Sequence, residues 1–192
     1  AAPTVPPLPD DKHHKADDAP YGGGRGMVML PEPLYLCHEA LTSGEHVHTV
    51  MMSAQGAPFN QAKARELLAR ERFIIVCGHY EGIDQRFIDT CVDEEISIGD
   101  FVLTGGEIPA MAVADAVCRM VPGVLPDETA FQEESHWNGL LEYPQYTHPA
   151  EWRGLEVPPV LLSGHHANIA RWRHKMSLKR TRRDVGSAGQ AG

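Results

Sequence analysis

The hydrophobic pattern of the first 120 residues alternates between strand-like and helix-like segments. Residues 73–77 (FIIVC) are apolar without a break, which is typical of a strand covered on both faces. Residues 46–52 alternate as a half-buried strand does and lead into a loop at residues 53–56. Helical spacing of apolar positions recurs in three segments, residues 31–41, 60–72 and 107–120. A strand, a helix and a strand at these distances predict an α/β fold with a parallel sheet.

Two glycine-bearing loops stand out within this pattern, at residues 78–82 and 105–107. Each follows an apolar run of strand-like composition, the first ending at Val76 and the second spanning residues 101–103. Glycine lets the backbone approach a ligand closely. Two such loops at strand ends predict a binding pocket there, with residues 96–103 forming a strand, a turn and a second strand.

The helix that begins at Glu107 restricts what this pocket can bind. A carboxylate in the first turn repels a phosphate group, and no Lys-Ser/Thr pair follows the glycines. We therefore expect a ligand without phosphates, or one whose phosphates lie elsewhere. The glycine-rich loop at residues 17–26 lacks the GxGxxG spacing, which argues against a nucleotide-dependent oxidoreductase. Because residues 27–29 are apolar, we expect this loop to be fixed against the core, with a flexible linker as the alternative.

Charge is distributed unevenly over the 192 residues. Residues 1–164 carry ten Lys/Arg against 25 Asp/Glu, whereas residues 165–192 carry seven against one. A basic segment attached to an acidic body indicates a phosphate-binding patch. A solubilising basic helix explains the charge equally well. We expect this helix to span residues 167–183.

The remaining composition narrows the class of protein. No apolar run reaches the roughly 18 residues of a membrane span, and the proline-rich residues 1–16 do not resemble a signal peptide, so we expect a cytoplasmic protein. The four cysteines lack CxxC spacing and have apolar neighbours, which predicts reduced, buried thiols. His46 and His48 share a strand face, but no third metal ligand is evident, so the metal content stays unknown.

Residues 122–138 form an acidic loop that is too long for a simple connector, which predicts either a lid or a linker. Glu142 follows it, among apolar and aromatic residues. Such a carboxylate suits a general base, although the local sequence alone favours a surface acid beside a turn.

Several motifs in order make the chain similar to one known family. They are DDAPYGGGRGMVM at 17–29, VCGHYEGID at 76–84, DEEISIGDFVLTGGEIPA at 93–110, PGVL at 122–125, GLLEYPQYT at 139–147 and EVPPVLLSGH at 156–165. Together they resemble the bacterial tRNA (guanine-N1)-methyltransferases of the TrmD type, in the SPOUT class. The resemblance extends from about residue 11 to about residue 180.

The resemblance implies methyl transfer from S-adenosylmethionine to N1 of the guanosine 3′-adjacent to the anticodon in tRNA. It also implies a homodimer and a SPOUT-type parallel sheet with a deep C-terminal trefoil knot, followed by a truncated helical segment. The cofactor residues it implies are Met52, Ser53, Gln55, Gly78, Tyr80, Glu81, Ile98, Gly99, Leu103, Gly105, Gly106 and Pro109. The catalytic base would be Glu142, where the family usually has Asp, with Glu81 as a second catalytic candidate. These two carboxylates are also the candidates for the magnesium associated with the family.

By the same resemblance, residues 1–16 are a proline-rich leader, 17–132 the methyltransferase domain, 133–148 a linker and 149–192 a truncated tRNA-binding domain. The RNA-binding candidates are Arg171, Arg173, Lys175, Lys179 and Arg180. The chain departs from the family pattern at both ends, and its loop at 123–138 has no arginine. The alternative is therefore a cofactor-binding RNA-interaction module of the same fold that has lost turnover.

Overall fold

The computed structural model describes residues 15–126, 131 and 134–188, with side chains up to residue 182 in the last range. The expected leader therefore lies almost wholly outside the described residues. The chain divides into two compact units, Ala1–Val124 and Leu125–Gly192.

The first unit is an α/β unit built on a parallel sheet. Its elements are β1 (Asp17–Asp18), β2 (Val28–Met29), α1 (Pro31–Thr42), β3 (Thr49–Pro58), α2 (Gln61–Leu68), β4 (Ile74–Cys77), α3 (Gln85–Cys91), β5 (Glu94–Ser97) and α4 (Glu107–Cys118). Strands β3, β4 and β5 are parallel in the order β4-β3-β5, and β1 pairs with β2 as an antiparallel hairpin. The predicted fold class is confirmed at this level.

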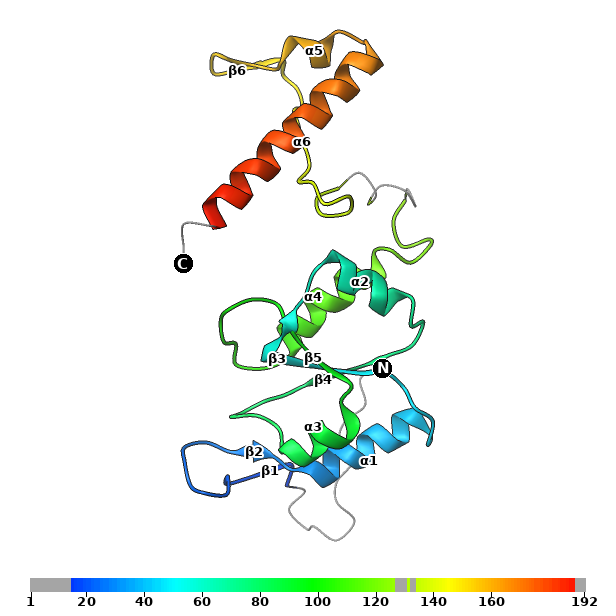
Figure 1. Ribbon diagram of the computed structural model, residues 1–192, viewed down its shortest axis with the longest axis vertical. Coiled ribbons are helices and arrows are strands. Elements are labelled where there is room, and N and C mark those ends of the chain that lie inside the picture. The colour runs from blue at the N-terminus through cyan, green and yellow to red at the C-terminus, as the bar shows by residue number, and fades with distance from the viewer. Residues whose placement is uncertain (1–14, 127–130, 132–133, 189–192) are drawn as a thin grey trace. The chain divides into compact units, whose positions relative to one another are not determined.

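The four helices cover both faces of the sheet. Helices α1 and α3 lie on one face, and α2 and α4 lie on the other (Figure 1). The chain crosses the sheet in one direction from β3 to β4 and in the opposite direction from β4 to β5. Connections of one handedness therefore place α2 and α3 on opposite faces. Because the three strands are parallel, their carboxyl ends meet at one edge of the sheet.

Each face of the sheet has its own core. On the α1 and α3 side, Leu34, Met51, Ile83 and Phe87 form a buried cluster. Successive strand residues point to opposite faces, so Val50, next to Met51, belongs to the α2 and α4 side. Val50 is fully buried, as are Ala64, Leu67 and Val113 of these two helices. These residues fix the strands whose ends form the site.

Two helix ends show why the predicted bounds shift. The Asn60 side chain accepts a hydrogen bond from the Lys63 backbone N–H at 3.0 Å, so α2 begins one residue after its N-cap. Helix α2 ends at Leu68 rather than at residue 72, and Glu71 then takes a left-handed φ of 58°. Helix α1 ends at Thr42, and the next residue, Ser43, is left-handed as well.

Two predictions were wrong, a strand at residues 101–103 and a loop at residues 53–56. Residues 101–103 form no strand: Phe101 lies in a tight turn closed by its N–H bond to the Gly99 carbonyl, and Val102 is 85% exposed. The expected loop at residues 53–56 is instead part of β3. Met52 and Ala57 of β3 both pair with Ile96 of β5, so the residues between them form a bulge.

The cysteine prediction holds only in part. All four thiols are free, but none is fully buried in this chain, and Cys118 is exposed. Cys118 lies at the end of α4, on the side away from its buried residues. Burial still raises the pKa of Cys37, Cys77 and Cys91.

The second unit consists of a hairpin and two helices. Its elements are β6 (Glu151–Trp152), β7 (Leu155–Glu156), α5 (Pro159–Leu162) and α6 (His166–Ala188). The predicted basic helix is confirmed and extends a few residues further at its C-terminal end. Among the described helices, none combines the length and the apolar character needed to cross a bilayer.

Candidate active site

The main cavity of the first unit opens at the carboxyl ends of the parallel strands. Its volume is about 490 Å³, within the range of small-molecule sites. Met52 lies in β3 where its pairing with β4 ends, Gly78 follows β4, Ser97 is the last residue of β5, and Pro109 lies in the first turn of α4. Ligands of open α/β sheets bind at this edge because the strand order reverses there.

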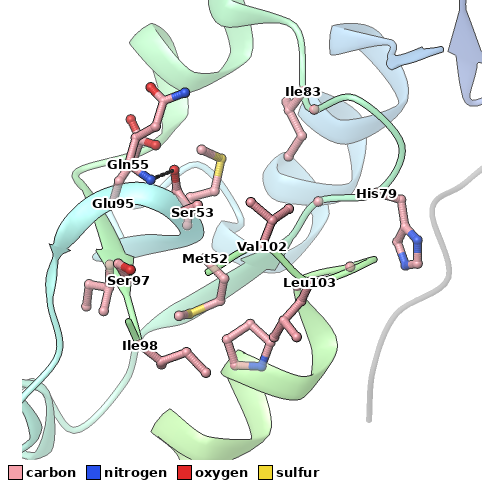
Figure 2. A pocket seen from close by; sticks show the side chains of 18 of the residues that line it. Met52, Ser53, Gln55, His79, Ile83, Glu95, Ser97, Ile98, Val102 and Leu103 are labelled. Carbon is pink, nitrogen blue, oxygen red and sulfur yellow. Dashed lines mark hydrogen bonds between the residues drawn. The ribbon is translucent and has the colours of Figure 1, made fainter. Parts of the chain in front are cut away.

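All twelve residues that the resemblance assigns to the cofactor line this cavity. In Figure 2, the apolar side chains of Met52, Ile98 and Leu103 lie together, and Ser53, Gln55 and Glu95 lie in another part of the cavity. The cavity thus combines an apolar region with hydroxyl, amide and carboxylate groups. The sequence predicted a strand before the second glycine loop. The structure has no strand there, and the exposed residues 101–103 precede the loop instead.

The two glycine loops touch through their backbones. The Gly106 N–H donates to the Gly78 carbonyl at 2.9 Å. A side chain at Gly106 could not fit, because its Cβ would lie 2.7 Å from the Cys77 Cα. Gly105 differs, since a Cβ there would meet the side chains of Glu107 and His79 at 2.5 and 3.0 Å. Only Gly106 is therefore restricted by immovable backbone.

Glu107, which we expected to exclude phosphate, has a partner in the structure. Its carboxylate forms a hydrogen-bonded ion pair with His79. This hydrogen bond lowers the pKa of Glu107 below its usual value. The first turn of α4 therefore presents a carboxylate and not an open anion site, which supports the prediction of a ligand without phosphates at this position.

The chain that follows the glycine-rich loop is fixed beside the cavity, whereas residues 21–26 of the loop itself are exposed, so the expected fixing of the loop holds only at its end. The Glu81 N–H donates to the Met27 carbonyl at 3.0 Å, and the Met29 N–H donates to the Gly82 carbonyl at 2.9 Å. Gly26 has a positive φ of 80°, and a Cβ there would lie 2.5 Å from the Glu81 carboxylate. The loop therefore needs glycine to make room for Glu81, a residue of the cavity wall.

The two histidines once considered as metal ligands pair with carboxylates. His46 hydrogen-bonds to Asp93 at 3.0 Å, and His48 to Glu94 at 2.8 Å. Burial raises the pKa of Glu94, but hydrogen bonds from Lys63 and His48 outweigh burial, so the net shift is downward. Within the described part of the chain, no group of three or more His, Cys, Asp or Glu side chains could hold a metal ion.

Glu142 belongs to the second unit and is half-buried. Its backbone is held at both ends, because its N–H donates to Ser135 Oγ at 2.9 Å and its carbonyl accepts from Arg180 at 3.0 Å. Its carboxylate accepts a hydrogen bond from the Gln145 side-chain amide. The surroundings are thus more polar than the neighbouring sequence suggests, and they fix the main chain on which the carboxylate is carried.

The five RNA-binding candidates are all exposed on α6, yet they form two groups. Arg171, Lys175 and Lys179 follow one another at intervals of four residues and so share a face of the helix. Arg173 and Arg180 instead contact the segment that carries Glu142: the Arg173 guanidinium lies 4.7 Å from the Tyr143 ring centroid.

Sequence reasoning missed several residues of the cavity wall, among them His79, Ile83, Glu95, Ser97 and Val102 (Figure 2). All five lie inside the motifs quoted above, and His79, Ser97 and Val102 are direct sequence neighbours of residues that were chosen. Strand position could have identified Ser97, because it is the last residue of a strand whose end borders the cavity.

The comparison with known proteins agrees with this geometry. The sequence pattern described as tRNA (Guanine-1)-methyltransferase TrmD matches residues 7–185. A tRNA (guanine-N(1)-)-methyltransferase of Desulforamulus reducens is 57% identical over 174 residues, covering 89% of this chain and 68% of the relative. Relatives with the same name from Ruminiclostridium cellulolyticum and Carboxydothermus hydrogenoformans are 56% and 58% identical, covering 90% and 91% of this chain and 75% and 70% of their own lengths. The chain therefore belongs to the TrmD family of tRNA (guanine-1)-methyltransferases, and its sheet is of the SPOUT type that defines this family.

Proposed function

We propose that this protein is an S-adenosylmethionine-dependent tRNA (guanine-N1)-methyltransferase that acts on the guanosine 3′-adjacent to the anticodon. One observation carries the proposal: the twelve residues taken from the family's motifs, scattered over residues 52–109, line a single cavity in a chain of that family. A module without turnover, the alternative, has no observation in its favour. A tRNA substrate also supports a cytoplasmic location.

The cavity suits S-adenosylmethionine better than a nucleotide with phosphates. This methyl donor carries a positively charged sulfonium and an ammonium group. The cavity wall includes the carboxylates of Glu81 and Glu95, while Met52, Ile98 and Leu103 provide an apolar surface for a flat ring. In this proposal, these side chains hold the methyl donor, and the glycine loops let the backbone N–H and C=O groups approach the donor closely.

The chemistry also requires a base. Guanine N1 carries a proton and is a poor nucleophile until that proton leaves. We propose that the N1 proton passes to the Glu142 carboxylate and that the N1 lone pair forms a bond to the methyl carbon, whose bond to sulfur breaks. A positioned base contributes roughly 10²–10⁴ in rate. Glu81 is the second catalytic candidate, since it lies in the cavity wall.

Glu81 and Glu142 remain the candidate residues for magnesium, which proteins usually bind through one or two carboxylates together with water and substrate oxygens. The proposed mechanism assigns no step to magnesium.

Two structural features of the family are part of the proposal as well. We propose a deep trefoil knot around residues 99–106, supported by the close backbone contact of Gly106 with Cys77 and Gly78. We also propose a homodimer. Its support is the outer side of α4, where Ile108 and Met111 are 63% and 70% exposed, an unusual exposure for large apolar side chains.

The direct test is methyl transfer by this chain to an unmodified tRNA with guanosine next to the anticodon. We expect one methyl group per tRNA, located at N1 of that guanosine by mass spectrometry of the digested product. A tRNA with adenosine at this position is the matched control and should accept none. Binding of both S-adenosylmethionine and tRNA without any transfer would support the alternative module instead.

A second prediction concerns the face of α6 that carries Arg171, Lys175 and Lys179. Lys175→Gln together with Lys179→Gln should weaken tRNA binding and flatten its salt dependence by roughly 1.4–1.8 log units per decade of salt, at 0.7–0.9 per phosphate contact. The measurement is tRNA affinity between 50 and about 300 mM salt by filter binding. Arg65→Gln on α2 with Arg70→Gln in the turn after it removes the same charge and should leave the slope intact. An unchanged slope in the α6 variant would assign this face to solubility.

A further inference from the structure

The second unit contains a cavity of its own, of about 360 Å³. Below it is called the aromatic cavity. It lies between residues 143–150, the chain after β7 and the first half of α6. Its wall consists of Tyr143, Pro144, Gln145, Tyr146, Thr147, His148, Ala150, Val157, Leu161, Leu162, Ile169, Trp172 and Arg173. None of these residues belongs to the proposed methyl-donor site.

The wall of this cavity contains the aromatic rings of Tyr143, Tyr146 and Trp172 and one arginine side chain. The rings of Tyr146 and Trp172 are 6.2 Å apart and tilted by 58°, so they support each other without leaving a gap between them. Tyr146 is 48% exposed, which leaves part of its ring surface available. The Arg173 guanidinium lies over the Tyr143 ring. No carboxylate is present among the lining residues that the structure describes.

This combination selects a particular class of ligand. A flat ring can stack on Tyr146, while Arg173 favours a ligand that carries negative charge. Single-stranded nucleic acids are bound in this way, through bases stacked on aromatic side chains beside a positively charged surface. The excess of seven basic over one acidic residue in 165–192 gives the charge complementarity. A free apolar metabolite would not need this charge.

We propose that the aromatic cavity receives one unstacked base of the tRNA, which stacks on the exposed face of Tyr146 while Arg173 contacts the adjoining phosphate. The inference rests on the proposed function, because it presumes a tRNA substrate. It adds base stacking to tRNA binding, which the phosphate contacts proposed for Lys175 and Lys179 do not supply.

The test compares two replacements of Tyr146 in the full chain. Tyr146→Leu retains apolar volume but removes the π-surface, whereas Tyr146→Phe retains it. We expect Tyr146→Leu to weaken binding of the unmodified tRNA transcript roughly 5- to 150-fold, the range found for loss of one stacked base. Because stacking releases no counterions, the loss should be equal at low and high salt and the slope unchanged. Tyr146→Phe should bind within about twofold of the wild type.

Further measurements separate the outcomes. Circular dichroism and thermal unfolding confirm that both variants are folded, and Tyr35→Leu on α1 serves as a control at another partly exposed tyrosine. If the wild type methylates tRNA and Tyr146→Leu binds it with unchanged affinity, the inference is wrong and the proposed function stands. Altered oligomeric state at unchanged tRNA affinity overturns it too and makes the cavity a contact between copies. If the wild type neither binds nor methylates tRNA, both proposals fall.

Discussion

Replacing Glu142 by glutamine is expected to lower the single-turnover rate of methyl transfer by two orders of magnitude or more, the contribution of a general base. Glutamine keeps the size of the side chain and can still accept the Gln145 hydrogen bond, but it cannot take up the guanine N1 proton. The backbone bonds to Ser135 and Arg180 do not depend on the side chain, so the local main chain should be retained. Rapid-quench measurement with enzyme in excess over tRNA isolates the chemical step.

Glu142→Asp is the matched control for this prediction. Aspartate, which the family resemblance implies as the usual residue here, keeps the carboxylate but places it one methylene closer to the main chain. Activity should therefore be retained, while the affinities for S-adenosylmethionine and tRNA stay near wild type in both variants. A rate near wild type for Glu142→Gln would place the base elsewhere, with Glu81→Gln as the next variant to measure.

Replacing Gly106 by alanine is expected to raise the Kd for S-adenosylmethionine at least tenfold. The added Cβ would lie 2.7 Å from the Cys77 Cα and 2.9 Å from the Gly78 nitrogen, so the two glycine loops must separate. Overpacking of this kind costs about 1–3 kcal/mol of stability. Titration calorimetry measures the Kd, and thermal unfolding measures the loss of stability.

Gly105→Ala is the neighbouring control. Its Cβ would meet only the Glu107 and His79 side chains, both about half-exposed and able to move. Because Gly105 also lines the cavity, the Kd of this variant should rise as well, but less than that of Gly106→Ala, since a side chain there displaces only movable groups. Equal effects of the two substitutions, or a folded Gly106→Ala protein with wild-type affinity, would contradict the assignment of the loop contact to the methyl-donor site.

Several features followed from the sequence because they depend on local rules. The unbroken apolar run at 73–77 and the periodic segments that became α1, α2 and α4 reflect burial patterns that repeat along the chain. Nine of the twelve cavity residues lie in the motifs quoted above, and motif residues are local in sequence. The other three, Met52, Ser53 and Gln55, lie at the end of the predicted strand 46–52 and in the loop expected after it. The charge of Glu107 likewise restricted the ligand without any knowledge of the fold.

Other features were decided only by contacts between distant segments. Residues 101–103 have the composition of a strand, but a strand needs a neighbour, and the chain at Gly105 bridges to His79 instead. The stretch at 53–56 stays within β3 because β5 pairs on both sides of it. The partners of His46, His48 and Glu107 lie 28 to 47 residues away in sequence. Periodicity and composition determined which segments are helices or buried strands. Tertiary packing decided which backbone edges and side chains meet, because the energy of pairing depends on residues that are distant in sequence.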